Sequence, residues 1–104
     1  MEKLIQDNKV AVLYSPGFGA GWYSWNNVNY GEEIMFDPIL VQYILQAKYD
    51  EAVTYVTMRW PEAYTGGLKD LQVEWIPVGT AFRIHEYDGA ETIELKDKMD
   101  WVTA

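Results

Sequence analysis

The chain has 104 residues, of which 49% are hydrophobic, and its sixteen acidic and eight basic residues give a net charge of −8. The hydrophobic content excludes a disordered chain, and the negative charge disfavours binding to long DNA or RNA. The absence of cysteine excludes disulfides, thiolate nucleophiles and cysteine-ligated zinc. Because no apolar run suits a membrane span or a signal peptide, we expect a single soluble domain over residues 1–104, in the cytoplasm and with no membrane partner.

The first predicted element is a strand at residues 9–14, where the sequence is nearly continuously apolar. It ends at Ser15-Pro16-Gly17, which cannot continue a β-ladder. The following segment, Gly17–Asn27, combines three glycines, four aromatic residues and two amides. It is predicted to be a loop with unusual backbone angles.

Two helices are predicted between residues 37 and 60. Asp37-Pro38 is typical of a helix start, since Asp is a favourable N-cap and Pro suits the first helical position. Residues 38–49 then place apolar residues on one face, which predicts an amphipathic helix. Residues 50–60 suit either a helix or a strand, and the prediction is a second helix that is capped by Asp50 and ends before Pro61.

The C-terminal part is predicted to be a sheet. Apolar residues alternate with polar ones from Leu71 to Trp75, and Pro77-Val78-Gly79 supplies a turn. Segments 81–87 and 90–96 flank Asp88-Gly89, a strong signal for a two-residue hairpin turn. The resulting register pairs Tyr87 with Ala90, Glu86 with Glu91, His85 with Thr92, Ile84 with Ile93, Arg83 with Glu94, and Phe82 with Leu95.

The pairing of two glutamates near the hairpin tip is the exception in this register, because it places like charges together. It requires either a solvated tip or a longer turn. Taken together, the predicted elements indicate an α+β fold. We expect an antiparallel sheet of four to five strands with one or two helices, from residues 37–60, packed on one face.

Five Trp, eight Tyr and three Phe cannot all be enclosed by one small core, so some rings must lie at the surface. Exposed rings are common in binding surfaces, and they favour a homo-oligomer because they need covering. The glycine-rich segment matches neither the dinucleotide fingerprint nor a P-loop. Its aromatic residues either pack over the sheet or form the wall of a pocket for a planar, nucleotide-like ligand.

In the pocket interpretation, most of the ligand-binding residues come from the glycine-rich segment. A second loop, residues 61–68, is either a simple connection, a second wall of the same site or part of a subunit contact. The hairpin supplies polar side chains. The candidate set is Phe18, Gly19, Gly21, Trp22, Tyr23, Trp25, Asn26, Tyr64, Arg83 and His85.

Catalysis and metal binding have weaker support. His85 is the only histidine, and as a general base it would need a nucleophile and an orienting carboxylate that the sequence does not place. Glu32, Glu33 and Asp37 lack the spacing of a calcium loop and instead lead into a helix, whose N-terminus favours negative charge. We expect no catalytic residue, no metal and no cofactor.

Several short motifs, in this order, resemble a group of small uncharacterised proteins of tailed bacteriophages and prophages. The motifs are Ser15–Trp22, Phe36-Asp37-Pro38, Pro61–Tyr64 with Gly66-Gly67-Leu68, Gly79-Thr80 with Phe82-Arg83-Ile84, Glu86–Gly89, and Asp100-Trp101. The resemblance covers nearly the whole chain and implies a viral origin and a host-cytoplasm setting. It implies no catalytic residues, since no activity is assigned to that group.

Small accessory phage proteins often act by binding, which suggests the leading hypothesis for function. It is a non-enzymatic accessory protein that counters host defence, either by sequestering a small nucleotide-like signal or by docking on a host protein through an acidic and aromatic surface. One alternative is a small hydrolase that uses carboxylates and His85. The other is a structural or assembly protein of the virion.

Overall fold

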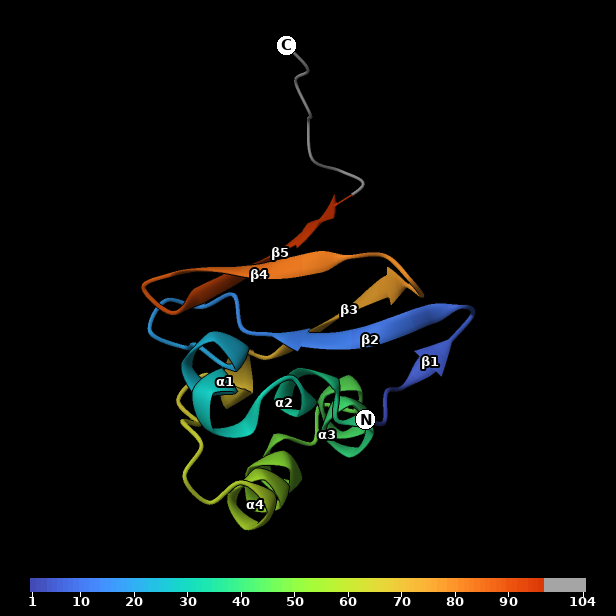
Figure 1. The fold of residues 1–104 in the computed structure, drawn as a ribbon. Coiled ribbons are helices and arrows are strands. Elements are labelled where there is room, and N and C mark those ends of the chain that lie inside the picture. Colours follow the sequence, from blue (N-terminus) through green and yellow to red (C-terminus); the bar gives the residue numbers. More distant parts are fainter. Residues whose placement is uncertain (97–104) are drawn as a thin grey trace.

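The computed structural model describes residues 1–96 (Figure 1), so the Asp100-Trp101 motif lies outside the described residues. The described strands form two antiparallel sheets, one of three strands in the order β1-β2-β3 and one of two strands, β4-β5. The elements are β1 (Ile5–Gln6), β2 (Lys9–Tyr14), α1 (Tyr23–Tyr30), α2 (Glu33–Phe36), α3 (Pro38–Leu45), α4 (Tyr49–Arg59), the 3₁₀ turn η1 (Leu68–Asp70), β3 (Gln72–Pro77), β4 (Phe82–Tyr87) and β5 (Ala90–Leu95).

The α+β class is confirmed, but the expected single sheet with one or two helices is not what the structure shows. Within residues 1–96 the strands divide into two sheets and there are four α-helices. Figure 1 shows the β4–β5 hairpin above the three-stranded sheet and the helices below it. The sheets separate because the hairpin packs against one face of β2 instead of extending its edge.

Strand β2 is the centre of the fold, because both of its faces are buried. Ala11 and Leu13 belong to the larger core cluster with helices α3 and α4. On the opposite face, Val12 packs with Ile76 and with apolar residues of α2 and the hairpin. This two-sided burial is the physical reason for the continuous apolar run that predicted a strand at these residues.

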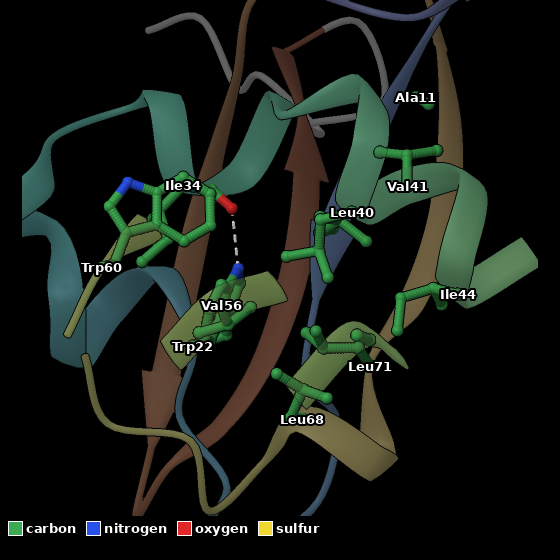
Figure 2. Close-up of a cluster of buried hydrophobic side chains, with 12 residues drawn as sticks. Ala11, Trp22, Ile34, Leu40, Val41, Ile44, Val56, Trp60, Leu68 and Leu71 are labelled. Carbon is green, nitrogen blue, oxygen red and sulfur yellow. Dashed lines mark hydrogen bonds between the residues drawn. The ribbon is translucent and has the colours of Figure 1, made fainter. Parts of the chain in front are cut away.

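The larger core is built around Trp22, which is fully buried (Figure 2). Its indole Nε1 donates a hydrogen bond to the carbonyl oxygen of Ile34 at 2.7 Å, drawn as the dashed line in Figure 2. Its ring meets that of Trp60 edge to face, with the ring centroids 6.3 Å apart. Two of the five tryptophans are therefore interior packing residues, which reduces the aromatic surface left for recognition.

The predicted helix pair is confirmed with altered boundaries. The first helix ends at Leu45 and not near Tyr49, because the chain turns through Ala47 at φ +55°. The second, α4, begins at Tyr49, one residue before the predicted cap. Asp37 occupies the N-cap position of α3 but makes no capping hydrogen bond, because its carboxylate accepts a hydrogen bond from the Tyr55 hydroxyl.

The hairpin register is confirmed at all six predicted pairs. Asp88 and Gly89 have φ values of +53° and +85°, as a two-residue turn with both central residues in the left-handed region requires. A second turn of this kind, at Asp7 and Asn8 with φ of +50° and +62°, joins β1 to β2. It was not predicted, although Asp and Asn are the residues that best tolerate that conformation.

Candidate functional site

Glu91 organises the glycine-rich segment, although it was not among the predicted site residues. Its side chain is fully buried. One carboxylate oxygen accepts the Ser15 N–H at 2.8 Å. The other accepts the Trp22 N–H at 3.1 Å, the Ser24 N–H at 2.7 Å and the Ser24 hydroxyl at 2.6 Å. The chain between β2 and α1 is thus wrapped around a carboxylate supplied by β5.

This arrangement explains why a helix, residues 23–30, begins within the segment 17–27 that was predicted to be a loop. The N-cap residue Trp22 supplies no side-chain hydrogen bond to the first turn. Glu91 takes that role from a distant strand, and negative charge at a helix N-terminus is favourable. The predicted loop therefore ends near Gly21, and the residues after it are the first turn of α1.

The same hydrogen bonds resolve the conflict between the two facing glutamates. Glu86 and Glu91 are cross-strand partners, as predicted, and the turn has two residues. The Glu91 carboxylate is enclosed by donors, whereas Glu86 is exposed and its carboxylate accepts the Gly89 N–H at 2.8 Å. Each carboxylate thus has its own donors, so their like charges are tolerated.

Two glycines from other loops let the backbone of the glycine-rich segment pack closely. A Cβ atom at Gly67 would lie 1.6 Å from the carbonyl oxygen of Ala20. A Cβ atom at Gly89 would lie 2.8 Å from the backbone nitrogens of Gly19 and Ala20. The Gly19 N–H also donates to the carbonyl oxygen of Asp88 at 2.6 Å. Because Gly67 and Gly89 have no side chain, the second loop and the hairpin turn can pack directly on the backbone of the glycine-rich segment.

Two predicted ligand-binding residues have interior side chains, which corrects the expectation that they face a ligand. Trp22 lies in the core. Asn26 is also buried: its amide nitrogen donates to the carbonyl oxygens of Trp22 and Tyr64 at 2.8 and 3.1 Å, and its amide oxygen accepts the Tyr64 N–H at 2.7 Å. Asn26 therefore fixes the second loop against α1.

Four exposed rings gather around the glycine-rich segment, and we call them the aromatic surface. Phe18 and Tyr87 are 74% and 77% exposed, and Trp25 and Tyr64 are 41% and 40% exposed. Phe18 meets Tyr87 edge to face at 6.4 Å, and Trp25 meets Tyr64 at 4.8 Å. The two pairs are connected because the Tyr64 hydroxyl donates to the carbonyl oxygen of Gly19 at 2.6 Å.

Three of these four rings were predicted to belong to the site, and Tyr87 was missed. Its sequence position, just before the hairpin turn, gave no sign that the hairpin tip would meet the glycine-rich segment. Of the other predicted residues, Gly21 is buried beside the Trp25 ring. Tyr23 is half-buried and lines a separate groove beside β4.

Arg83 and His85 share one face of β4 with Tyr87, since side chains alternate along a strand. Both contact the carboxylate of Glu94, which lies 3.0 Å from the Arg83 Nε and 2.8 Å from the His85 Nε2. The hydrogen bond from His85 and, to a smaller extent, the hydrogen bond from Arg83 lower the pKa of the Glu94 carboxyl group. These two residues extend the aromatic surface with a polar, exposed ion-pair cluster.

The contact between His85 and Glu94 supplies the carboxylate partner that the sequence did not place. Among the described residues, the side-chain contact of His85 is the one to Glu94. Within residues 1–96, no three histidine or carboxylate side chains converge so as to hold a metal ion.

A second polar cluster joins α2 and α4, and the sequence gave no indication of it. Arg59 Nη2 lies 2.7 Å from a carboxylate oxygen of Glu33, and the same oxygen accepts the Trp60 Nε1–H at 2.9 Å. Burial and, to a smaller extent, the hydrogen bond to Asp37 raise the pKa of the Tyr55 hydroxyl. Because these groups satisfy one another, the cluster fastens α4 to the rest of the helical layer.

The helices in residues 1–96 are all too short to span a bilayer, since the longest, α4, has 11 residues. Comparisons of the chain with protein families, with curated proteins and with solved structures found no match.

Proposed function

We propose that this protein is a non-enzymatic binding protein that docks on a partner protein through the aromatic surface. The observation that carries the proposal is the cluster of exposed rings at Phe18, Trp25, Tyr64 and Tyr87, which come from the glycine-rich segment, α1, the second loop and β4. The Glu91 hydrogen bonds to Ser15, Trp22 and Ser24 fix the segment that carries Phe18 and the start of α1. Rigid aromatic side chains lose little conformational entropy on binding, which is why they are enriched at the centres of interfaces.

A partner protein fits this surface better than a small planar ligand. The rings meet edge to face and leave no stacked pair of parallel faces. The polar groups that would specify a small ligand are already used within the chain, including the Asn26 amide and the Gly19 N–H and carbonyl groups. A flat protein surface needs fewer such groups, because shape and apolar contact supply most of the affinity.

The charge around the rings favours a partner with a basic rim. Glu62, Asp70, Glu86 and Asp88 are all exposed and lie close to aromatic-surface residues along the chain or in space. The chain has a net charge of −8, and these four acidic residues would steer it toward a positively charged patch on a partner. As part of the same proposal, the resemblance to phage proteins makes a host protein the expected partner.

The test is a quantitative capture experiment with matched variants. Wild-type protein, the double variant Phe18→Ala/Tyr87→Ala and the control Met58→Ala would be immobilised and exposed to the same bacterial lysate. Met58 is 80% exposed on α4 and makes no part of the aromatic surface. Any retained protein would then be purified and its Kd measured against all three.

We expect the double variant to bind the purified partner at least about thirtyfold more weakly, as loss of a hot-spot ring costs about 2 kcal/mol or more. Met58→Ala should bind like wild type, and added salt should weaken binding. Equal affinity of the double variant and wild type would refute the proposal. The expected homo-oligomer is a competing use of the same surface. If sedimentation shows a wild-type dimer that the double variant converts to monomer, the surface is covered by a second copy instead.

A further inference from the structure

A groove of about 480 Å³ runs between β4 and the helices α1 and α2. One wall is formed by residues 80–84, and the other includes Tyr23, Met35 and Phe36. The volume lies within the range of about 300–1,000 Å³ that is usual for ligand sites. None of the four rings of the aromatic surface lines the groove, although Arg83, which extends that surface, is part of its wall.

The β4 wall presents unpaired main-chain groups. In the hairpin register, the Lys96 N–H donates to the Ala81 carbonyl at 2.9 Å, which shows that odd-numbered β4 residues bond to β5. The N–H and C=O groups of Phe82, Ile84 and Glu86 therefore point away from β5. Among the described residues, these three N–H groups have no hydrogen-bond partner. No β5 residue lines the groove, so it lies on the open side of β4.

An open strand edge beside an apolar groove is the geometry in which an extended peptide adds a strand. The main chain of the peptide pairs with the edge, and every second side chain enters the groove. Here the apolar wall is continuous, because the rings of Phe36 and Phe82 meet edge to face at 6.2 Å. The wall at residues 80–84 is five residues long, which in extended conformation spans about 17 Å and matches a peptide of four or five residues.

The charges at the two ends of the groove set the direction of the peptide. The Lys3 ammonium lies 4.5 Å from the ring centroid of Phe36, at the end where β4 begins. Two other charged residues line the groove, Glu32 and Arg83, and Arg83 is paired with Glu94. Exposed Glu86 and Asp88 lie past the other end of the groove, toward the hairpin turn. A strand antiparallel to β4 would place its C-terminus near Lys3 and its N-terminal residues near the two acids. A parallel strand would do the reverse, with a carboxylate facing carboxylates.

We propose that this groove binds the carboxy-terminal segment of another protein as a strand antiparallel to β4. The terminal carboxylate pairs with Lys3, apolar side chains at alternate positions contact Met35 and Phe36, and a basic residue upstream faces Glu86. This binding mode goes beyond the proposed function, because it uses a different surface and recognises a chain end in place of a folded surface.

The probe is a library of heptapeptides displayed with free carboxyl termini and selected on the full chain. We expect enrichment of sequences with apolar residues at every second position from the C-terminus. Fluorescence polarisation with a synthetic peptide of the enriched sequence would then measure Kd for wild type, Lys3→Gln and the control Lys9→Gln. Lys9 is an exposed lysine on β2 that does not line the groove.

Lys3→Gln should weaken binding by about fivefold, as expected for a largely exposed ion pair, and amidation of the peptide C-terminus should do the same. The two changes should not add, because they remove the same interaction. Methylation of the peptide nitrogens should weaken binding at least about tenfold at alternate positions only. Lys9→Gln and Phe18→Ala should bind like wild type, so this test fails or succeeds independently of the aromatic surface.

Three results would overturn the proposal. The first is a selection that enriches no sequence. The second is an N-methyl scan without a two-residue period, which would mean that the peptide does not pair with β4. The third is sedimentation showing a wild-type dimer that Lys3→Gln dissociates, which would make a second copy of the chain the occupant.

Discussion

The replacement of Glu91 by Gln tests the interaction on which the described site depends. It keeps the size of the side chain but converts one acceptor oxygen into an amide nitrogen, which is a donor. Four donors now converge on the carboxylate, one on the first oxygen and three on the second. In the less costly orientation, the amide oxygen keeps the three donors and the amide nitrogen faces the Ser15 N–H, with no acceptor between them.

The size of the effect follows from these contacts. One buried N–H left without an acceptor costs about 1–3 kcal/mol, and three bonds lose the strengthening that an ionised acceptor gives. Part of this loss is offset because the neutral amide is cheaper to bury than a carboxylate. We therefore expect the free energy of unfolding to fall by about 2–4 kcal/mol, which for a domain of this size lowers Tm by on the order of 10–20 °C.

Urea denaturation followed by circular dichroism would give the change in unfolding free energy, and hydrogen exchange would locate it. Protection should be lost first at the N–H groups of Ser15, Trp22 and Ser24. Glu86→Gln is the matched control, because it makes the same change on the cross-strand partner, which is exposed and keeps an oxygen for the Gly89 N–H. A difference of less than about 0.5 kcal/mol between the unfolding free energies of Glu91→Gln and wild type is typical of a neutral surface substitution. Such a result would mean that Glu91 does not hold the loop.

Three further substitutions test the packing. Gly67→Ala should cost at least about 3 kcal/mol in urea denaturation, or prevent folding, because its Cβ would overlap the Ala20 carbonyl oxygen at 1.6 Å. Trp22→Ala should cost about 3–5 kcal/mol by the same measurement, and a smaller loss would show that the core closes over the cavity. Burial and the hydrogen bond to Asp37 raise the pKa of the Tyr55 hydroxyl in the folded protein. The stabilisation that this gives is therefore present below the unfolded pKa of about 10 and is lost as pH rises above it. Stability should thus decline more steeply above that pH in wild type than in Tyr55→Phe, and parallel pH profiles would contradict the assignment.

The elements that could be predicted from the sequence are those fixed by local contacts. The hairpin register followed from Asp88-Gly89 alone, because a two-residue turn leaves only one alignment of the flanking strands. Strand β2 was recognisable because burial on both faces leaves a continuous apolar run. Helix α4 was predicted from its apolar spacing despite strand-forming residues, since its apolar face packs on the core.

Helix α1 and the division into two sheets were missed because they depend on contacts between distant parts of the chain. Helix α1 has no capping residue of its own, and its first turn is held by Glu91, 67 residues further on than Ser24. The division into two sheets has a similar origin. The Glu91 N–H donates to the Ser15 carbonyl oxygen at 2.8 Å, which holds the tip of the hairpin beside the end of β2, while the apolar face of the hairpin packs on one face of β2. Neither contact leaves a local pattern in the sequence.

Glu91 also links the two proposed binding surfaces, because both depend on where the hairpin sits against α1. Its carboxylate joins β5 to the first turn of α1. The groove is lined by Tyr23 of α1 and by β4, and the contact between Phe18 and Tyr87 joins the glycine-rich segment to β4. At a temperature where the Glu91→Gln variant is still folded, we expect it to bind both the partner protein and the carboxy-terminal peptide more weakly than wild type does. Phe18→Ala should weaken only the binding of the partner protein, and Lys3→Gln only the binding of the peptide. If a folded Glu91→Gln variant binds both ligands with wild-type Kd, the hairpin is held in place by its apolar face alone, and the carboxylate stabilises the loop without setting either surface.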